Sequence, residues 1–257
     1  YGNNKVFGQP KGLKSIGFVS IVLVNNKSGF GETYSGIYVP ELIKPLISFF
    51  SNKLVGLRLV DLFDKLDKIV EIPFVGFAGI FQSIKASISI AALDVLSKSI
   101  ELPIYKLFKT ELSPIKTYIS GGSVAYTSNE IREDAYNLKE IGFNFYKMRM
   151  GLQELKHDIN RIKNAISVFG ENKSVIVDMI QGTLKSSYDN NQLEIIFKEL
   201  NNFKLNWGEE PIEPHEMAKL SFIKSISKNP IATGEAYSGI SHFKNLINPD
   251  YIDIVQY

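Results

Sequence analysis

The chain has 257 residues, of which 44% are hydrophobic and 22% are charged, a composition typical of a globular protein. It contains no cysteine, which excludes disulfide bonds, a thiolate nucleophile and cysteine-ligated metal centres, so any metal would need oxygen or imidazole ligands. The 29 basic residues nearly balance the 27 acidic ones and form no basic run, so we expect no nucleic-acid partner.

The two longest apolar runs, residues 16–24 and 74–81, are far shorter than the roughly 20 residues that span a bilayer. We therefore expect a soluble, cytoplasmic protein with no membrane partner. Because the sequence begins with Tyr1 rather than Met, a preceding segment, including a targeting signal, stays open.

Residues 1–112 are predicted to form an α+β domain. A β-branched and aromatic run at 16–24 is followed by turn residues and by Phe30-Gly31-Glu32, a pattern that predicts a β-hairpin. From Val39 to about Phe108, apolar residues recur at helical spacing, which predicts helices after the hairpin. The clearest apolar series is Ile84, Ile88, Ala91, Ala92 and Val95.

Residues 113–257 are predicted to form an α/β domain. Short apolar strands alternate with amphipathic helices about every 30 residues, which is typical of a parallel sheet. One helical stripe runs from Leu155 to Phe169 and is ended by Gly170, and Thr127 and Glu130 have capping-box spacing. The predicted strands are residues 115–119, 145–148, 174–179, 204–209, 231–235 and 252–257.

Charged residues stand at the carboxyl ends of four predicted strands. They are Lys147 and Arg149, Asp178, Glu209 and Glu235. A doubly wound open sheet and a (β/α) barrel both fit the strand–helix alternation. In a barrel all strand ends converge on one mouth, where active sites lie, whereas in an open sheet they fan out along an edge. We therefore favour the barrel.

The three carboxylates predict a divalent cation. Without a cation, carboxylates this close would raise one another's pKa. Oxygen ligands with open water positions suit Mg²⁺ better than Ca²⁺, so Asp178, Glu209 and Glu235 are the predicted ligands. Such a metal would stabilise the ene-diolate that forms when a proton leaves the carbon next to a carboxylate. Glu210 neighbours a ligand, but strand alternation is expected to point it to the other face of the sheet.

Five short motifs surround these residues: Tyr146-Lys147-Met148-Arg149-Met150-Gly151, Val177-Asp178, Gln181-Gly182, Glu209-Glu210-Pro211 and Gly234-Glu235. Their order and spacing resemble the mandelate racemase and muconate lactonizing enzyme branch of the enolase superfamily. The resemblance implies an N-terminal α+β capping domain and a modified (β/α)₇β TIM-type barrel, with Mg²⁺ as cofactor. It implies a small-molecule carboxylate substrate, such as a sugar acid, and leaves a homo-oligomer open.

Residues 147–149 resemble a Lys-x-Lys motif, in which the first lysine helps to hold the substrate carboxylate and the second is the base. Here the second position is Arg149, and a guanidinium cannot be deprotonated in a protein. We expect Lys147 to hold the carboxylate and Arg149 to stabilise charge. The resemblance then implies a histidine base, which is expected after Tyr257 because the histidines present fall in predicted helices or at their starts. These are His157, His215 and His242.

Residues 113–257 are too few for a whole barrel, which typically takes about 250 residues. With six predicted strands, we expect an incomplete barrel and a capping domain that lacks its first strand. The favoured activity is the dehydration of an acid sugar by an enolase-superfamily lyase. The alternatives are a racemase or epimerase, a cycloisomerase of the muconate lactonizing type, and a non-catalytic or truncated metal-binding member.

Overall fold

The structure is a computed structural model that describes residues 15–76, 78–108, 110–184 and 188–257. The chain divides into two compact units, the first ending at Pro114 and the second beginning at Ile115. The predicted roles of residues 1–112 as a capping domain and of residues 113–257 as a barrel domain stay predictions.

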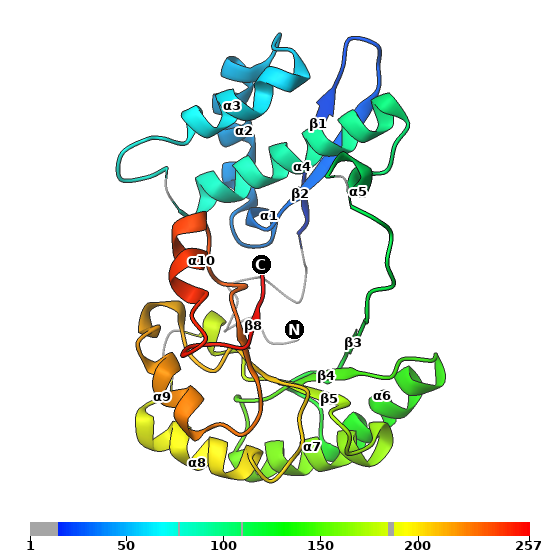
Figure 1. The fold of residues 1–257 in the computed structure, drawn as a ribbon, viewed down its shortest axis with the longest axis vertical. Helices are drawn as coiled ribbons and strands as arrows, with labels where there is room; N and C mark the ends of the chain where they lie inside the picture. The colour runs from blue at the N-terminus through cyan, green and yellow to red at the C-terminus, as the bar shows by residue number, and fades with distance from the viewer. Residues whose placement is uncertain (1–14, 77, 109, 185–187) are drawn as a thin grey trace. The chain divides into compact units, whose positions relative to one another are not determined.

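The first unit contains the predicted hairpin. Strands β1 (Gly17–Val22) and β2 (Ser28–Thr33) pair antiparallel, and helix α4 (Ile80–Ile100) runs along them (Figure 1). The backbones approach closely because β2 carries glycine where it meets the helix. A Cβ atom at Gly31 would lie only 1.9 Å from the carbonyl oxygen of Ser87. The glycine therefore allows the hairpin to pack directly on the helix.

The helices predicted between Val39 and Phe108 are confirmed. They are α2 (Pro40–Leu54), α3 (Leu59–Ile69), α4 and α5 (Ile104–Leu107), and the short helix α1 (Ser35–Tyr38), which was not predicted, precedes them. The apolar series predicted for α4 is buried along its whole length, from Ile84 to Val95. The core of this unit comprises Val19, Phe50, Leu54, Leu62, Leu66, Ile69, Val70, Ile84, Ile88 and Ala92.

Helix α4 is long and apolar enough, by length and composition alone, to cross a membrane. The two short apolar runs noted in the sequence did not indicate such a helix. Of its most apolar window, 33% is buried inside the structure, and Ile84 and Ile88 belong to the core. The core helix of a soluble protein passes the same test, so this one helix is weak evidence for a membrane.

The second unit contains one parallel sheet whose six strands follow one another in sequence order. This order has no reversal of the kind that defines a doubly wound sheet, and it matches consecutive staves of a barrel. The prediction of an incomplete six-stranded barrel is confirmed. The strands are β3 (Ile119–Ser120), β4 (Tyr146–Arg149), β5 (Val175–Asp178), β6 (Gly208–Glu209), β7 (Ile231–Thr233) and β8 (Ile254–Val255).

Several strands are shorter than predicted, and the first prediction was largely wrong. Residues 115–118 were expected to be strand, but β3 begins at Ile119 and pairs only with β4. Ile115 is 84% exposed, so its apolar character does not reflect burial in this unit. β3 is therefore an edge strand, with a neighbour on one side only.

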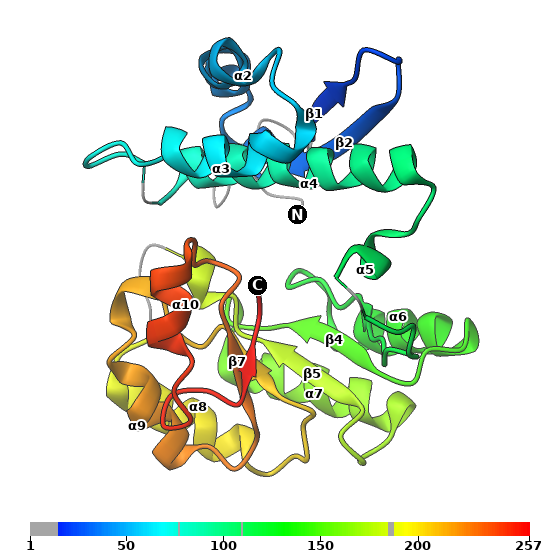
Figure 2. The ribbon, with the colours of Figure 1, turned by 45° about the horizontal axis from the view of Figure 1, so that its top comes forward.

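Helices connect the strands and follow one side of the curved sheet (Figures 1 and 2). The predicted capping box begins the first of them, since the Thr127 N–H donates to Glu130 Oε2 at 2.7 Å. The second ends at Gly170, as predicted, with φ at 98°. The helices are α6 (Ser128–Glu140), α7 (Leu155–Phe169), α8 (Asn190–Leu200), α9 (Lys219–Ile226) and α10 (Ile240–Leu246), with 3₁₀ turns η2 (Gln181–Thr183) and η3 (Pro214–Glu216).

A buried ion pair in α7 anchors two turns at the carboxyl end of the sheet. Arg161 Nη1 lies 2.5 Å from Asp158 Oδ1, and both side chains are 1% exposed. The other Asp158 oxygen accepts the N–H of Gly151 at 2.8 Å, and Arg161 also donates to the carbonyl of Ser123. Burial raises the pKa of Asp158 although Gly151 and Arg161 act to lower it. The pair therefore holds the turns after β3 and β4 in place.

Replacing Asp158 with alanine is expected to lower the free energy of unfolding by about 3 kcal/mol, because the Arg161 charge would stay buried without its partner. Urea-induced unfolding followed by circular dichroism measures the loss. The matched control is Asp61→Ala, which removes another Arg–Asp pair at a spacing of three residues, with side chains 79% and 46% exposed. An exposed pair contributes little, so equal effects of the two variants would contradict the assignment of this stability to burial.

Candidate active site

The carboxyl ends of the strands bring four of the five predicted site residues into contact. The strand register sets Arg149 opposite Asp178, and Asp178 opposite Glu209. Residues paired in this way share one face of the sheet, and Lys147, two residues before Arg149, lies on the same face. The four charges therefore meet on the side of the sheet that would line the barrel interior.

The ammonium of Lys147 is the centre of this cluster. It donates to Glu209 Oε1 and lies 3.2 Å from Asp178 Oδ2. All three residues are buried, with exposures of 6% for Lys147, 3% for Asp178 and 0% for Glu209. Burial acts to lower the pKa of Lys147, but the two carboxylates outweigh it and raise the pKa above its usual value. Lys147 is therefore a protonated cation at neutral pH.

The side chain of Asp178 is held by both its own turn and its neighbours. Its Oδ1 accepts the N–H of Ile180 at 2.8 Å, and its Oδ2 lies 3.8 Å from Arg149 Nε. Burial raises the pKa of Asp178, and the charge of Glu209 adds to this while Lys147 opposes it. The aspartate thus lies in a site that favours additional positive charge.

Glu209 has a second partner that the sequence analysis missed. The indole N–H of Trp207, the only tryptophan of the chain, donates to Glu209 Oε2 at 3.0 Å. The Trp207 ring packs edge-on against Tyr118, with 5.5 Å between the centroids. Strand alternation could have identified Trp207, because residues two apart on a strand point to the same face. Both carboxylate oxygens of Glu209 are therefore engaged, one by Lys147 and one by Trp207.

Arg149 is half-buried at the edge of the cluster. Besides its approach to Asp178, its Nη1 donates to the carbonyl of Gly121 at 3.4 Å. Gly121 follows β3, so the guanidinium lies between the ends of β3 and β5. This position suits the electrostatic role expected from the sequence, which stays a prediction.

Glu235 follows β7 and is exposed. Its pKa is nevertheless raised, first by partial desolvation and then by the charge of Asp178, with Glu209 adding to the effect and Lys147 opposing it. Glu235 is therefore near enough to Asp178 and Glu209 to interact with them electrostatically.

The donor chemistry of the cluster fits a hard divalent cation. Three carboxylates follow the ends of successive parallel strands, and such oxygen donors suit this kind of ion. Burial raises the pKa of Asp178 and of Glu235, and neighbouring carboxylates add to the rise: Glu209 for Asp178, and both Asp178 and Glu209 for Glu235. Within the part of the chain that the structure describes, no three His, Asp or Glu side chains are grouped so that they could hold a metal ion as they stand. The cation that two of the carboxylates share is the Lys147 ammonium. The assignment of Asp178, Glu209 and Glu235 as metal ligands stays a prediction.

Glu210, the residue after Glu209, is also buried, with 1% exposure. Its Oε1 accepts hydrogen bonds from the hydroxyl of Thr233 at 2.6 Å and from the N–H of Gly234 at 3.0 Å. Burial raises the pKa of Glu210 to about 7. Nothing in the local sequence pattern indicates these contacts, because they join residues more than twenty positions apart.

The three histidines lie outside the cluster. His157 is in α7, His215 is in η3 and His242 is in α10, and all three side chains are exposed. The structure thus agrees with the expectation that these histidines fall in helices or at their starts.

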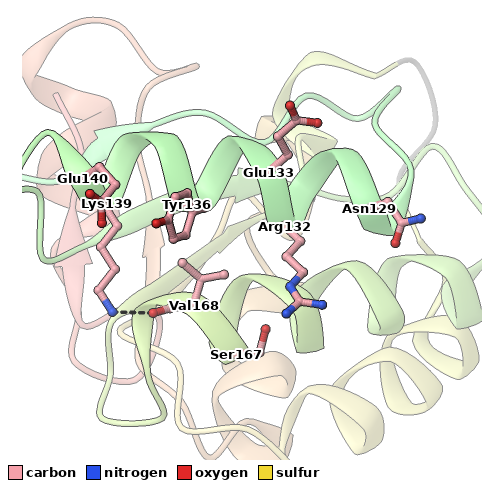
Figure 3. A pocket seen from close by; sticks show the side chains of 8 residues that line it. All are labelled: Asn129, Arg132, Glu133, Tyr136, Lys139, Glu140, Ser167 and Val168. Atoms are coloured by element: carbon pink, nitrogen blue, oxygen red, sulfur yellow. Dashed lines mark hydrogen bonds between the residues drawn. The ribbon is translucent and has the colours of Figure 1, made fainter.

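A wide surface hollow of about 670 Å³ lies away from the cluster, between α6 and α7 (Figure 3). Arg132, Tyr136 and Lys139 line it, and Lys139 donates to the carbonyl of Val168. None of the predicted site residues lines this hollow, so its size does not make it the candidate active site.

Comparisons with known proteins agree with the fold. Residues 130–257 match the family model described as "Enolase C-terminal domain-like". The chain is 24% identical over 183 residues to the L-talarate/galactarate dehydratase of Salmonella typhimurium, covering 71% of this chain and 45% of the relative. It is 25% identical over 238 residues to the arabinonate dehydratase of Saccharolobus solfataricus, covering 89% and 61%. The N-succinyl-L-Arg/Lys racemase of Bacillus cereus is 25% identical over 174 residues, covering 66% and 45%.

Solved structures of similar fold include enzymes of two reaction types. The 3,6-anhydro-D-galactonate cycloisomerase from Zobellia galactanivorans superposes with a TM-score of 0.82 at 25% identity, covering 94% of this chain and 66% of that one. The L-talarate/galactarate dehydratase from Salmonella typhimurium, liganded with Mg and L-lyxarohydroxamate, has a TM-score of 0.82 at 22% identity, with coverages of 94% and 61%. The chain spans about half to three fifths of the length of the curated relatives named above.

Addition of Mg²⁺ is expected to change the fluorescence of Trp207, because its indole N–H is bonded to a predicted ligand. In such a titration, Glu235→Gln is expected to weaken Mg²⁺ binding by more than about 100-fold, because loss of even an outer partner of a metal ligand costs about 10–100-fold. The control is Glu171→Gln, an exposed glutamate in the turn after α7, which should bind Mg²⁺ as the unaltered protein does. Unchanged affinity in Glu235→Gln would remove Glu235 from the site.

Proposed function

The chain belongs to the enolase superfamily, and from this membership we propose that it is a Mg²⁺-dependent enzyme that removes the proton from the carbon next to a substrate carboxylate. The proposed reaction is the dehydration of a sugar acid. The C–H bond beside the carboxylate breaks, its electrons form a carbon–carbon double bond, and the hydroxyl group on the next carbon leaves, with a proton, as water. Two of the similar enzymes are dehydratases of this substrate class by name.

The observation that supports this proposal is the buried Lys147 ammonium between Asp178 and Glu209. An ammonium at this position can hold an anionic substrate group. Arg149, beside it, keeps its charge as well. This side of the cluster therefore offers two cations suited to a substrate carboxylate.

The remaining roles follow from the predicted site. Asp178, Glu209 and Glu235 would hold Mg²⁺, which supplies Lewis-acid stabilisation of negative charge on the substrate carboxylate, as is general for this superfamily. Lys147 would bind one carboxylate oxygen of the substrate and Arg149 would stabilise the charge that develops as the proton leaves. The proposal assigns the base to none of the three histidines, because all are exposed on helices away from the cluster.

Racemisation, epimerisation or cycloisomerisation is the second candidate function. It begins with the same proton abstraction, and the similar proteins include a racemase and a cycloisomerase. The reactions differ after that step, because a dehydratase loses water while these isomerases retain every atom of the substrate.

The proposed activity predicts exchange of the α-proton of a sugar acid with solvent deuterium. Galactarate and arabinonate, incubated with the protein and Mg²⁺ in D₂O, should lose the α-proton signal in NMR spectra, with a keto acid appearing if water is eliminated. Isomerisation would give exchange without a keto acid. Lys147→Met should reduce the rate more than about 100-fold, in line with loss of a group that stabilises the transition state.

The control for charge is Lys163→Met, an exposed lysine on α7, which should leave the rate unchanged. Binding of Mg²⁺ without proton exchange in any acid sugar would contradict the proposed enzyme and indicate a non-catalytic metal-binding member.

A further inference from the structure

The turn that carries Glu235 is fastened by a buried carboxylate that is not in the predicted metal set. Glu210 Oε1 accepts from the Gly234 N–H at 3.0 Å and from the Thr233 hydroxyl at 2.6 Å. Gly234 immediately precedes Glu235. We infer that Glu210 is a positioning residue, which fixes the turn after β7 and thereby orients the Glu235 carboxylate. This inference rests on the proposed role of Glu235 as a metal ligand.

The backbone of Glu210 connects three strands as well. Its N–H donates to the carbonyl of Ala232 in β7 at 3.0 Å, and its carbonyl accepts the N–H of Gln181, in the turn after β5, at 3.0 Å. The residue adopts a positive φ of 48°, which is unusual for a residue other than glycine. Such a conformation persists only where the surroundings enforce it. Glu210 is therefore held rigidly at the point where the ends of β5, β6 and β7 meet.

The second carboxylate oxygen of Glu210, Oε2, is buried and closely packed and accepts no hydrogen bond from the described residues. A Cβ atom at Gly182 would lie 2.0 Å from this oxygen, so only glycine leaves room for the carboxylate there. A buried polar atom without a partner costs free energy. Retaining a carboxylate here is consistent with a role that needs a strong acceptor for Thr233 and Gly234.

Glu209 and Glu210 point to opposite faces of the strand and therefore have different partners. Glu209 points to the face that carries Lys147, whereas Glu210 contacts Thr233, the residue after the one that pairs with Glu209. Glu210 therefore contacts the backbone next to Glu235, at the Gly234 N–H, and not the Glu235 side chain. It acts on Glu235 through the Gly234 amide and not by sharing a ligand.

The test compares Glu210→Gln, which keeps the acceptor oxygen, with Glu210→Leu, which removes it. Two readouts are used on the full chain: hydrogen–deuterium exchange of the segment containing Gly234, and Mg²⁺ affinity from Trp207 fluorescence. Glu210→Leu is expected to speed exchange and to weaken Mg²⁺ binding about tenfold. Glu210→Gln is expected to stay close to the unaltered protein in both exchange rate and Mg²⁺ affinity. Thr233→Val, which removes one of the two donors to Glu210, should show a smaller effect of the same sign.

The outcomes separate this inference from the proposed function. Equal weakening of Mg²⁺ binding in both Glu210 variants, with exchange unchanged, would show that the charge of Glu210 matters directly and would overturn the positioning role. Unchanged exchange in Glu210→Leu would overturn it as well. If the unaltered protein does not bind Mg²⁺, the proposed function fails, while the exchange of the Gly234 segment still decides whether Glu210 fixes the turn.

Discussion

The candidate site depends on an imbalance of charge at the ends of four parallel strands. Lys147 and Arg149 bring two positive charges, whereas Asp178, Glu209 and Glu235 bring three negative ones. Burial raises the pKa of Asp178 and of Glu235, and the charges of neighbouring carboxylates add to the rise, so a further cation nearby would stabilise the ionised carboxylates. A divalent cation together with an anionic substrate would restore the balance. The same imbalance therefore motivates both the metal and the choice of a carboxylate as substrate.

The register of the parallel strands determines which charged side chains meet in the site. Because Arg149, Asp178 and Glu209 pair directly across β4, β5 and β6, their side chains must share one face. The strands are only two to four residues long, so each contributes little beyond its terminal residue. Positional precision then has to come from the turns, and these are held by buried polar groups: the Asp158–Arg161 pair after β3 and β4, and Glu210 after β7.

Much of this arrangement could be predicted from the sequence, because hydrophobic period and motif spacing are local signals. The hairpin, the six parallel strands, the capping box at Thr127 and the cluster of Lys147, Arg149, Asp178 and Glu209 are of this kind. The missed features are of two kinds. Trp207 lies two residues before Glu209, and strand alternation could have indicated their contact. The contact of Glu210 with Gly234 joins distant segments, and no local pattern encodes it. The strand expected at 115–118 was wrong because apolar residues at a sheet edge need not pair.

The replacement of a second lysine by Arg149 bears on which reaction the site suits. A racemase removes a proton from one face of the carbon and returns one to the other, so it needs a titratable group on each side. On the side that Lys147 and Arg149 occupy, the second position of the motif is a guanidinium, which cannot lose its proton, and the Lys147 ammonium lies between Asp178 and Glu209. That side can hold and neutralise a carboxylate but is poorly suited to accept a proton. Elimination of water needs a base on one side only, so the charge state of these two residues favours a dehydratase over a two-base isomerase.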